Sequence, residues 1–374
     1  MMKRRTVLKG GLLAAAAGFA PARLRAEEGP YVLGTLFPMA GPNAEYGTIF
    51  TEGAELALKH VAEDKMLRRP IVLRAEDSEG TPQGGAVGMT KLVNVDHAIY
   101  VLIGFTGVSK AAAPIGARAK VITVNGGGVG PDLAGLSPYY WNVIPLASAE
   151  VQRIAPYLVS KGFKRLAMMY MNDPFGIGVF KAMQTELPKA GGQLVGSYTI
   201  LPTDQQFAGV AARIRDTKPD AVYFASYGAQ QAQIIKQLRD NGIDRQLVTY
   251  SGASIPSVLN LPQSEGLLFT AQTAAWSSQD PVTQRFLADW RKTHQSQPST
   301  YHQNYYNAVR LFALLAQSLE QAGKPINGDT LRAELLRVRR FPLVGGEGTF
   351  DDLCDLSMPI DINTVHAGRI VKVA

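Results

Sequence analysis

Short apolar segments alternate with longer amphipathic segments along most of the chain. The short segments are rich in β-branched and aromatic residues, which is typical of strands, whereas the longer ones repeat apolar residues at helical spacing. A regular alternation of strand and helix predicts βα units that assemble into parallel sheets. We therefore expect an α/β fold.

Two series of predicted strands divide the chain. The first series lies at 31–37, 71–76, 100–103 and 121–124. The second lies at 165–170, 193–200, 221–225, 247–250 and 266–270, with helical patterns at 148–160, 176–190, 207–216 and 229–241. Each series is sufficient for one doubly wound sheet, so the pattern predicts two lobes.

Two long helical patterns follow the second series, at 283–293 and 304–322. They need a sheet to cover, and the first series has strands but too few helices of its own. We therefore expect the chain to cross between the lobes more than once.

Composition agrees with a folded two-domain protein. The 374 residues are 46% hydrophobic and 18% charged, which excludes a disordered, collagen-like or coiled-coil chain. At roughly 100 to 200 residues per domain, the length favours two domains.

The net charge of +7 comes almost wholly from the N-terminus. Of 38 basic residues, six lie among the first 26, where no acidic residue occurs, which leaves 32 basic against 31 acidic residues in the rest. Because the remaining 348 residues carry a net charge of only +1, we expect no nucleic-acid partner.

Residues 1–26 have the features of an export signal. A basic start with Arg4-Arg5 precedes a small, apolar run at 10–20, which is too short to span a bilayer. The paired arginines resemble a twin-arginine signal, and we expect cleavage after Ala26 and a periplasmic location. No cysteine follows the run, so we expect no lipid anchor. The alternative is a basic tail on a cytoplasmic protein.

The residues needed for catalysis or metal binding do not form recognisable motifs. Cys354 is the only cysteine, and the five histidines are scattered without metal-ligand spacing, so we expect no disulfide, metal or cofactor. The stretch 107–111 lacks the second glycine of a nucleophile elbow, and 126–130 does not complete a dinucleotide-binding motif. We expect a binding protein, not an enzyme.

The loops that follow the strands are the places to look for a ligand, because ligands of open α/β sheets sit beyond the carboxyl ends of the strands. These loops are mostly small and uncharged, at 38–47, 104–109 and 125–131. The second leads into a predicted helix, whose free backbone N–H groups could hold an anion.

The ordered motifs of the chain resemble a type I periplasmic binding protein, specifically the substrate-binding subunits of branched-chain amino acid and amide ABC transporters. The resemblance spans the chain from about Tyr31 to its end. It rests on the segments 33–41, 44–47, 76–78, 101–104, 172–176, 218–222, 305–308 and 348–351.

The family implies two Rossmann-like lobes joined by three crossing strands, which we place near Pro145, Ala274 and Asp355. Lobe 1 would comprise 27–145 with 275–355, and lobe 2 would comprise 146–274 with 356–374. A small-molecule ligand would bind between them and close the cleft. The permease and ATPase subunits of an ABC importer would then be the partners of a monomer.

On lobe 1, the family's pocket positions fall on one aromatic residue and two loops. Tyr46 would face the ligand side chain. Phe105 would add to an aromatic lining of the site. The first loop normally holds an α-carboxylate, often through a serine where this chain has Val108; its residues are Thr106, Gly107, Val108 and Ser109. The second loop usually takes the ammonium and carboxylate, although Val129 offers no hydroxyl; its residues are Gly127, Gly128 and Val129. The alternative for the second loop is a tight strand-to-helix turn.

On lobe 2, the corresponding positions are Phe175, Tyr227 and Ser251, and Trp276 follows the second crossing. Amino-acid-binding relatives often carry an acid at the position of Ser251. Burying an ammonium without a counter-charge costs several kcal/mol. We therefore expect a small carboxylate or amide, possibly aromatic, that lacks a free ammonium.

Two other hypotheses stay open. Asp77, Glu79 or Asp173 could replace the missing acid, in which case the ligand is a branched-chain amino acid. A protein of this fold could also present its ligand to a separate sensor.

Overall fold

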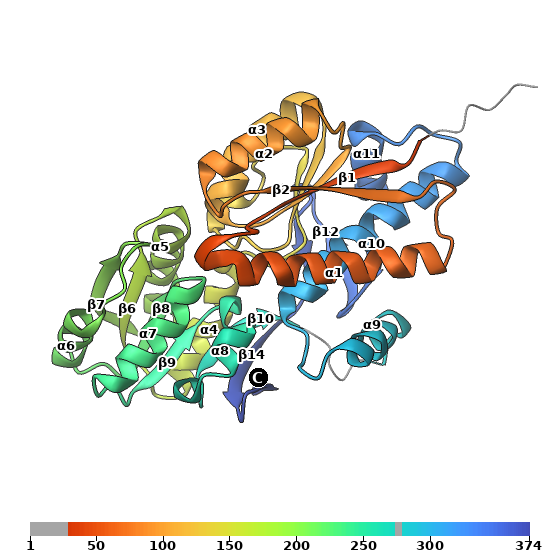
Figure 1. Ribbon diagram of the computed structural model, residues 1–374. Coiled ribbons are helices and arrows are strands. Elements are labelled where there is room, and N and C mark those ends of the chain that lie inside the picture. Colours follow the sequence, from red (N-terminus) through yellow and green to blue (C-terminus); the bar gives the residue numbers. More distant parts are fainter. Residues whose placement is uncertain (1–28, 274–278) are drawn as a thin grey trace, which may run out of the picture.

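The computed structural model describes residues 29–273 and 279–374. Two α/β lobes lie side by side, each with its own sheet (Figure 1). The predicted fold class is confirmed. Within the described ranges, no helix is both long and apolar enough to cross a membrane.

Lobe 1 is built on a five-stranded parallel sheet in the order β2-β1-β3-β4-β5. Figure 1 shows α2 and α3 on one face of this sheet and α1 and α10 on the other, which is a doubly wound arrangement. The strands are β1 (Tyr31–Phe37), β2 (Ile71–Asp77), β3 (Tyr100–Ile103), β4 (Ile122–Asn125) and β5 (Tyr140–Asn142). The helices are α1 (Ala44–Glu63), α2 (Pro82–Asn94), α3 (Thr106–Ala119), α10 (Thr300–Gln321) and α11 (Gly328–Val338).

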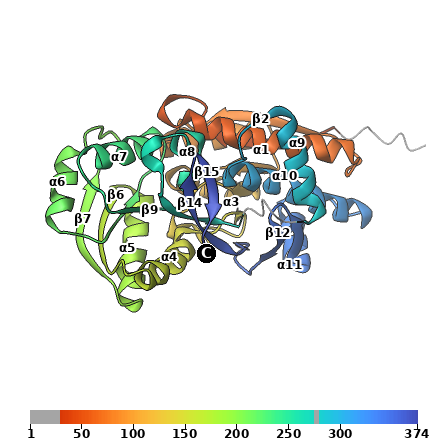
Figure 2. The same ribbon diagram turned by 90° about the horizontal axis from the view of Figure 1, so that it is seen from below.

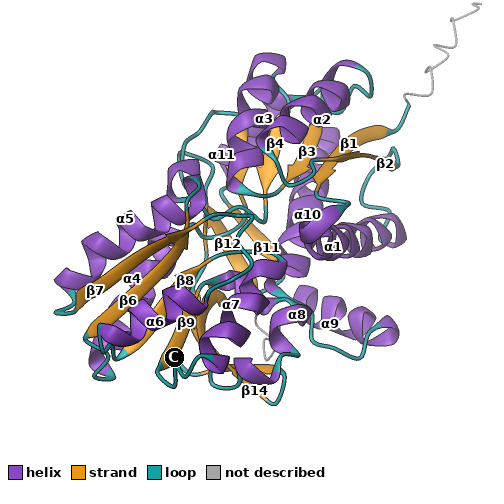
Figure 3. Ribbon diagram, turned by 60° about the vertical axis from the view of Figure 1, so that its left-hand side comes forward, coloured by secondary structure: helices purple, strands orange, loops and turns teal. Residues whose placement is uncertain are grey.

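Lobe 2 is built on a seven-stranded sheet in the order β15-β14-β10-β9-β8-β6-β7, in which β14 and β15 are antiparallel additions (Figure 3). The strands are β6 (Arg165–Met171), β7 (Gln193–Ile200), β8 (Ala221–Ala225), β9 (Gln246–Thr249), β10 (Leu268–Gln272), β14 (Ile360–His366) and β15 (Arg369–Lys372). The helices are α4 (Ala147–Ser160), α5 (Pro174–Lys189), α6 (Ala208–Asp216), α7 (Ala229–Asp240) and α8 (Pro256–Leu259).

The chain returns to lobe 1 after β10, as the unpaired long helices predict. Helix α10 lies against α1 so closely that a Cβ at Gly53 would stand 2.3 Å from the carbonyl oxygen of His302. Two buried tyrosines fix α10 to the sheet: the hydroxyl of Tyr305 donates to the Ile103 carbonyl at 2.7 Å, and that of Tyr100 to the Ala308 carbonyl at 2.8 Å. Helix α9 (Pro281–Thr293) and a small antiparallel sheet also belong to this second part of lobe 1. The strands of the small sheet are β11 (Arg340–Leu343), β12 (Gly346–Phe350) and β13 (Leu356–Ser357).

Three segments connect the lobes. The expected crossing at Pro145 lies between β5 and α4, and the expected crossing at Ala274 lies outside the described residues. Asp355 lies just before β13, and the chain passes to lobe 2 between β13 and β14. An isolated bridge pairs Asn142 with Asp355, so the first and third crossings run side by side.

Candidate functional site

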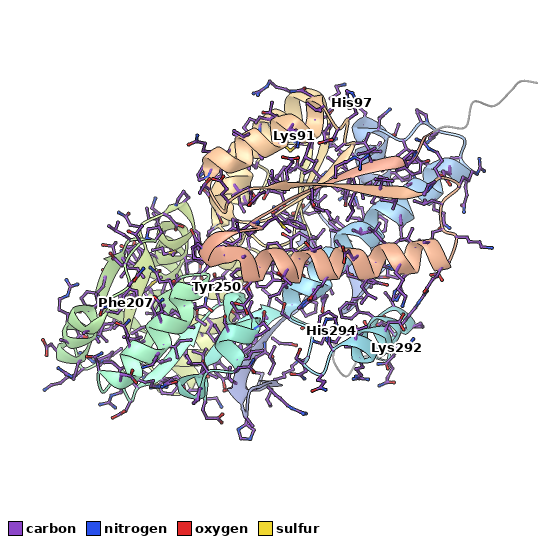
Figure 4. The ribbon with its side chains drawn as sticks, viewed as in Figure 1. Lys91, His97, Phe207, Tyr250, Lys292 and His294 are labelled. Atoms are coloured by element: carbon purple, nitrogen blue, oxygen red, sulfur yellow. The ribbon has the colours of Figure 1, made fainter. Side chains whose placement is uncertain are left out.

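A small cavity lies between the lobes, beyond the carboxyl ends of the parallel strands. Its volume is about 20 Å³, which is room for about one water molecule. Figure 4 shows one of its residues, Tyr250, at the junction of the two lobes. The cavity is lined by Tyr46, Phe105, Thr106, Gly107, Gly127, Gly128, Val129, Asp173, Phe175, Tyr227, Tyr250 and Tyr301.

Aromatic rings from both lobes fill most of this space. Phe105 of lobe 1 meets Tyr227 of lobe 2 edge-on, with ring centroids 5.2 Å apart. On the lobe 1 side Tyr46 packs against Phe105 at 5.5 Å, and on the lobe 2 side Phe175 packs against Tyr250 at 4.8 Å. The first two pairs are edge-to-face, an arrangement that is attractive beyond the area it buries. The rings must part before a ligand the size of a benzene ring can enter.

The first turn of α3 supplies the lobe 1 wall with hydrogen-bond donors. Phe105 precedes the helix with φ of +64° and makes no side-chain cap, so the turn receives no hydrogen bond from that side chain. The first N–H groups of a helix lack partners within it, and its dipole favours an anion there. Thr106 adds a buried hydroxyl, which accepts a hydrogen bond from the backbone N–H of Gly130 at 3.0 Å and can donate its own proton.

The glycine loop beside this turn is held by Asn125. The Asn125 Oδ1 atom accepts hydrogen bonds from the N–H groups of Gly127 at 3.2 Å and Gly128 at 2.7 Å. A Cβ at Gly127 would stand 2.7 Å from the Phe50 ring, and one at Gly128 would stand 2.9 Å from the backbone of Phe105. Packing therefore explains both glycines, and their N–H groups are already engaged.

Asp173 is the acid that lines the cavity among the residues described. It caps α5, since its Oδ1 atom accepts the Gly176 N–H at 2.7 Å. Its Oδ2 atom accepts the Tyr227 hydroxyl at 2.7 Å. Burial, followed by the charge of Asp173, raises the pKa of Tyr227 well above its usual range, so this phenol stays protonated. No lysine, arginine or histidine stands among the described lining residues.

Three of the predicted site residues lie away from the cavity wall. Val108 packs against α2, where its Cγ1 atom would stand 2.8 Å from a Cβ added to Gly85. Ser109 is fully buried beside Tyr140. Ser251 faces the interior of lobe 2, where it binds Glu150. The prediction for Trp276 lies outside the described residues. Tyr46, Phe105, Thr106, Gly107, Gly127, Gly128, Val129, Phe175 and Tyr227 come together at the cavity.

Ser251 binds a buried acid, Glu150 of α4. The Glu150 Oε1 atom accepts the Ser251 hydroxyl at 2.8 Å, and Oε2 accepts the Ser251 N–H at 3.0 Å and the Thr270 hydroxyl at 2.7 Å. Burial raises the pKa of Glu150 to about 7. Sequence reasoning missed this residue because an acid in the first turn of a helix is normally a surface residue. Tyr250 and Tyr301 were missed as well, since neither lies in a recognised motif.

A cluster of His60, Glu63 and Asp289 offers three metal-ligand atoms within 4.8 Å of one another. Asp289 is already paired with His60 at 2.9 Å and with Lys59 at 3.0 Å, and it also binds Lys292. The two lysine ammonium groups compete with any metal for the Asp289 carboxylate, so the cluster is an ion-pair network.

Comparison with known proteins identifies the family and several relatives of this chain. The family model described as "Periplasmic binding protein" matches residues 30–372. A Leu/Ile/Val-binding protein of Rhizobium johnstonii is 26% identical over 349 residues, covering 91% of this chain and 92% of that protein.

Two solved structures share the fold. A leucine-binding protein of Thermotoga maritima superposes with a TM-score of 0.84 at 20% identity, covering 92% of this chain and 97% of that one. A solute-binding protein of an ABC transporter from R. palustris, solved with benzoate, superposes with a TM-score of 0.83 at 17% identity, covering 92% of this chain and 96% of that one.

The matched family and these relatives are binding proteins, which confirms the prediction of a binding protein and not an enzyme. A family model that spans nearly the whole described chain, together with two lobes around a cavity, settles the assignment. The chain belongs to the periplasmic binding protein family.

Proposed function

We propose that this protein captures a small carboxylate with an aromatic or otherwise apolar body and no ammonium group, and delivers it to an ABC importer. The observation that carries the proposal is the polarity of the cavity wall. Helix α3 presents N–H donors and the Thr106 hydroxyl to an anion, and the remaining wall is mostly aromatic rings.

The acids near the cavity are poorly placed to hold an ammonium. Glu150 is buried and already accepts three hydrogen bonds from Ser251 and Thr270. Asp173 accepts hydrogen bonds from Tyr227 and Gly176. A buried ammonium without a dedicated counter-charge costs several kcal/mol, which is a large share of the roughly 8 kcal/mol of a micromolar complex.

The comparisons support both this ligand class and one competitor. The R. palustris neighbour was solved with benzoate, which is an aromatic carboxylate without an ammonium. The R. johnstonii relative is named for leucine, isoleucine and valine. Asp173 favours the competitor, because its carboxylate lies at the cavity and has lone pairs beyond the two it uses.

We further propose that residues 1–26 are a twin-arginine-type export signal, so that the mature protein works in the periplasm. We also propose that it is a monomer. The permease and ATPase subunits of the importer would be its partners. The family to which the chain belongs supports the location.

Calorimetric titration of ligand-stripped, refolded protein tests the ligand class. We expect benzoate to bind with a Kd of about 1–10 μM, and leucine to bind about a hundredfold more weakly, because the ammonium finds no dedicated partner. Tight leucine binding without a response to benzoate would refute the proposal in favour of an amino acid.

A further inference from the structure

A carboxylate contact between the lobes lies outside the cavity. Glu45, the second residue of α1 in lobe 1, receives two hydrogen bonds from Ser257 of α8 in lobe 2. The Ser257 N–H donates to Oε1 at 2.9 Å, and the Ser257 hydroxyl donates to Oε2 at 2.6 Å. Both oxygens of the carboxylate are thus engaged by a single residue of the other lobe.

The residues around Glu45 also contact lobe 2. The Tyr46 hydroxyl lies 3.4 Å from the carbonyl oxygen of Gly252. Asn43 approaches Gly228 so closely that a Cβ there would stand 2.2 Å from the Asn43 Oδ1 atom, and Gly228 has φ of +64°. Only glycine suits that position, so the segment 43–46 is fitted to lobe 2.

On the far side of the cleft the described residues of the two lobes touch by packing alone, since a Cβ at Gly178 of α5 would stand 2.7 Å from the Pro131 side chain. Beside this contact they leave a groove of about 750 Å³, bordered by Pro131 and Asp132 of lobe 1 and by α5 of lobe 2. Asp173 lines both this groove and the cavity, so the two adjoin. Figure 2 shows α1 and α8 towards one edge of the molecule and α4 and α5 towards the opposite edge. The carboxylate contact therefore closes the edge away from the groove.

These contacts need no ligand, because each partner belongs to the protein. They exist only while the lobes are together, so they stabilise the closed form over the open one. Within the cavity, the edge-on contact of Phe105 with Tyr227 also stabilises the closed form.

We propose that Glu45 and Ser257 form a latch that holds a measurable fraction of the ligand-free protein closed. The latch positions the two lobes and touches no ligand. It goes beyond the proposed function and does not depend on which solute binds.

Distance measurement between two nitroxide labels tests the latch without any ligand. Val87 of α2 and Gln184 of α5 are exposed on different lobes, so Val87→Cys with Gln184→Cys reports the separation of the lobes. The native Cys354 is buried, and burial raises its pKa to about 11, so it resists labelling. The labelled protein is compared with and without Glu45→Ala, in ligand-stripped samples.

We expect two distance populations, with Glu45→Ala lowering the ratio of closed to open molecules by about threefold to tenfold. Ser257→Ala should lower it less, since the backbone donor stays, and Ser257→Thr should leave it unchanged. The matched control is Glu265→Ala, which removes a carboxylate that binds His366 at 2.7 Å and the Ala367 N–H at 2.9 Å within lobe 2 alone.

A purely structural role for Glu45 would lower the melting temperature and leave the ratio unchanged, which would overturn the proposal. A wild-type distribution that is entirely open would overturn it as well. Neither result bears on the ligand class, which the calorimetric titration tests separately.

Discussion

The two walls of the cavity differ in the source of their polarity. The lobe 1 wall offers backbone dipoles and a hydroxyl at the start of α3, and its described residues carry no formal charge. The lobe 2 wall has Asp173 at its surface and Glu150 behind Ser251, and both acids already accept hydrogen bonds from their own lobe. The lobe 1 wall can therefore bind an anion, whereas the acids of the lobe 2 wall are paired with groups of their own lobe. Acidic residues near a pocket therefore do not by themselves make it a cation site.

The largest expected effect is on the pH dependence of folding stability, through the buried Glu150 of lobe 2. Burial raises the pKa of Glu150 to about 7, so the folded protein holds this proton more tightly than the unfolded chain does. The wild type therefore loses stability as the pH rises from about 4.5 to about 7, by up to about 3 kcal/mol. Urea denaturation at pH 5 and pH 8 measures the free energy of unfolding of Glu150→Gln and of the wild type. Between the two pH values the wild type should lose up to about 3 kcal/mol more than the variant. An equal loss in both proteins would show that burial does not destabilise the Glu150 carboxylate.

On the lobe 1 wall, Thr106→Val should weaken benzoate binding by about tenfold, because one hydrogen bond to a carboxylate is lost. The matched control is Thr123→Val in β4, a fully buried threonine of the same lobe that lies away from the cavity. The control should leave the Kd unchanged. Equal Kd values for Thr106→Val and the wild type would place the carboxylate elsewhere.

On the lobe 2 wall, Tyr227→Phe should have a smaller effect on ligand binding. It removes the hydroxyl that donates to Asp173 at 2.7 Å and so frees one carboxylate oxygen towards the cavity. Leucine should then gain about threefold to tenfold over benzoate in relative affinity, as measured by calorimetry. Tyr198→Phe is the control, since its hydroxyl donates to the Arg213 carbonyl at 3.0 Å within lobe 2. A relative affinity that stays constant would mean that Asp173 takes no part in selecting the ligand.

Much of the fold could be predicted because strand and helix periodicity is local. The predicted strands at 31–37, 100–103 and 193–200 match β1, β3 and β7 at both ends. The small sheet β11–β13 and the hairpin of β14 and β15 were not predicted, because four of these five strands have five residues or fewer and are too short to show a clear alternation. The return of α10 to lobe 1 could be predicted from the count of helices alone.

The site was predictable only where loop position determines it. Tyr46, Thr106 and Tyr227 lie at the cavity because they follow strand ends or begin helices that meet the cleft. The direction of a side chain within a turn is not encoded by spacing, which is why Val108 and Ser109 turned out to face the core. The contact of Glu150 with Ser251 joins residues far apart in sequence, so no local pattern reveals it.

A crystal structure grown with equimolar benzoate and leucine decides between the two ligand classes in one experiment, because the two compounds compete for one cavity. We predict electron density for benzoate, with its carboxylate against the first turn of α3 and the Thr106 hydroxyl. Electron density for leucine, with its ammonium against Asp173, would refute a ligand without an ammonium group.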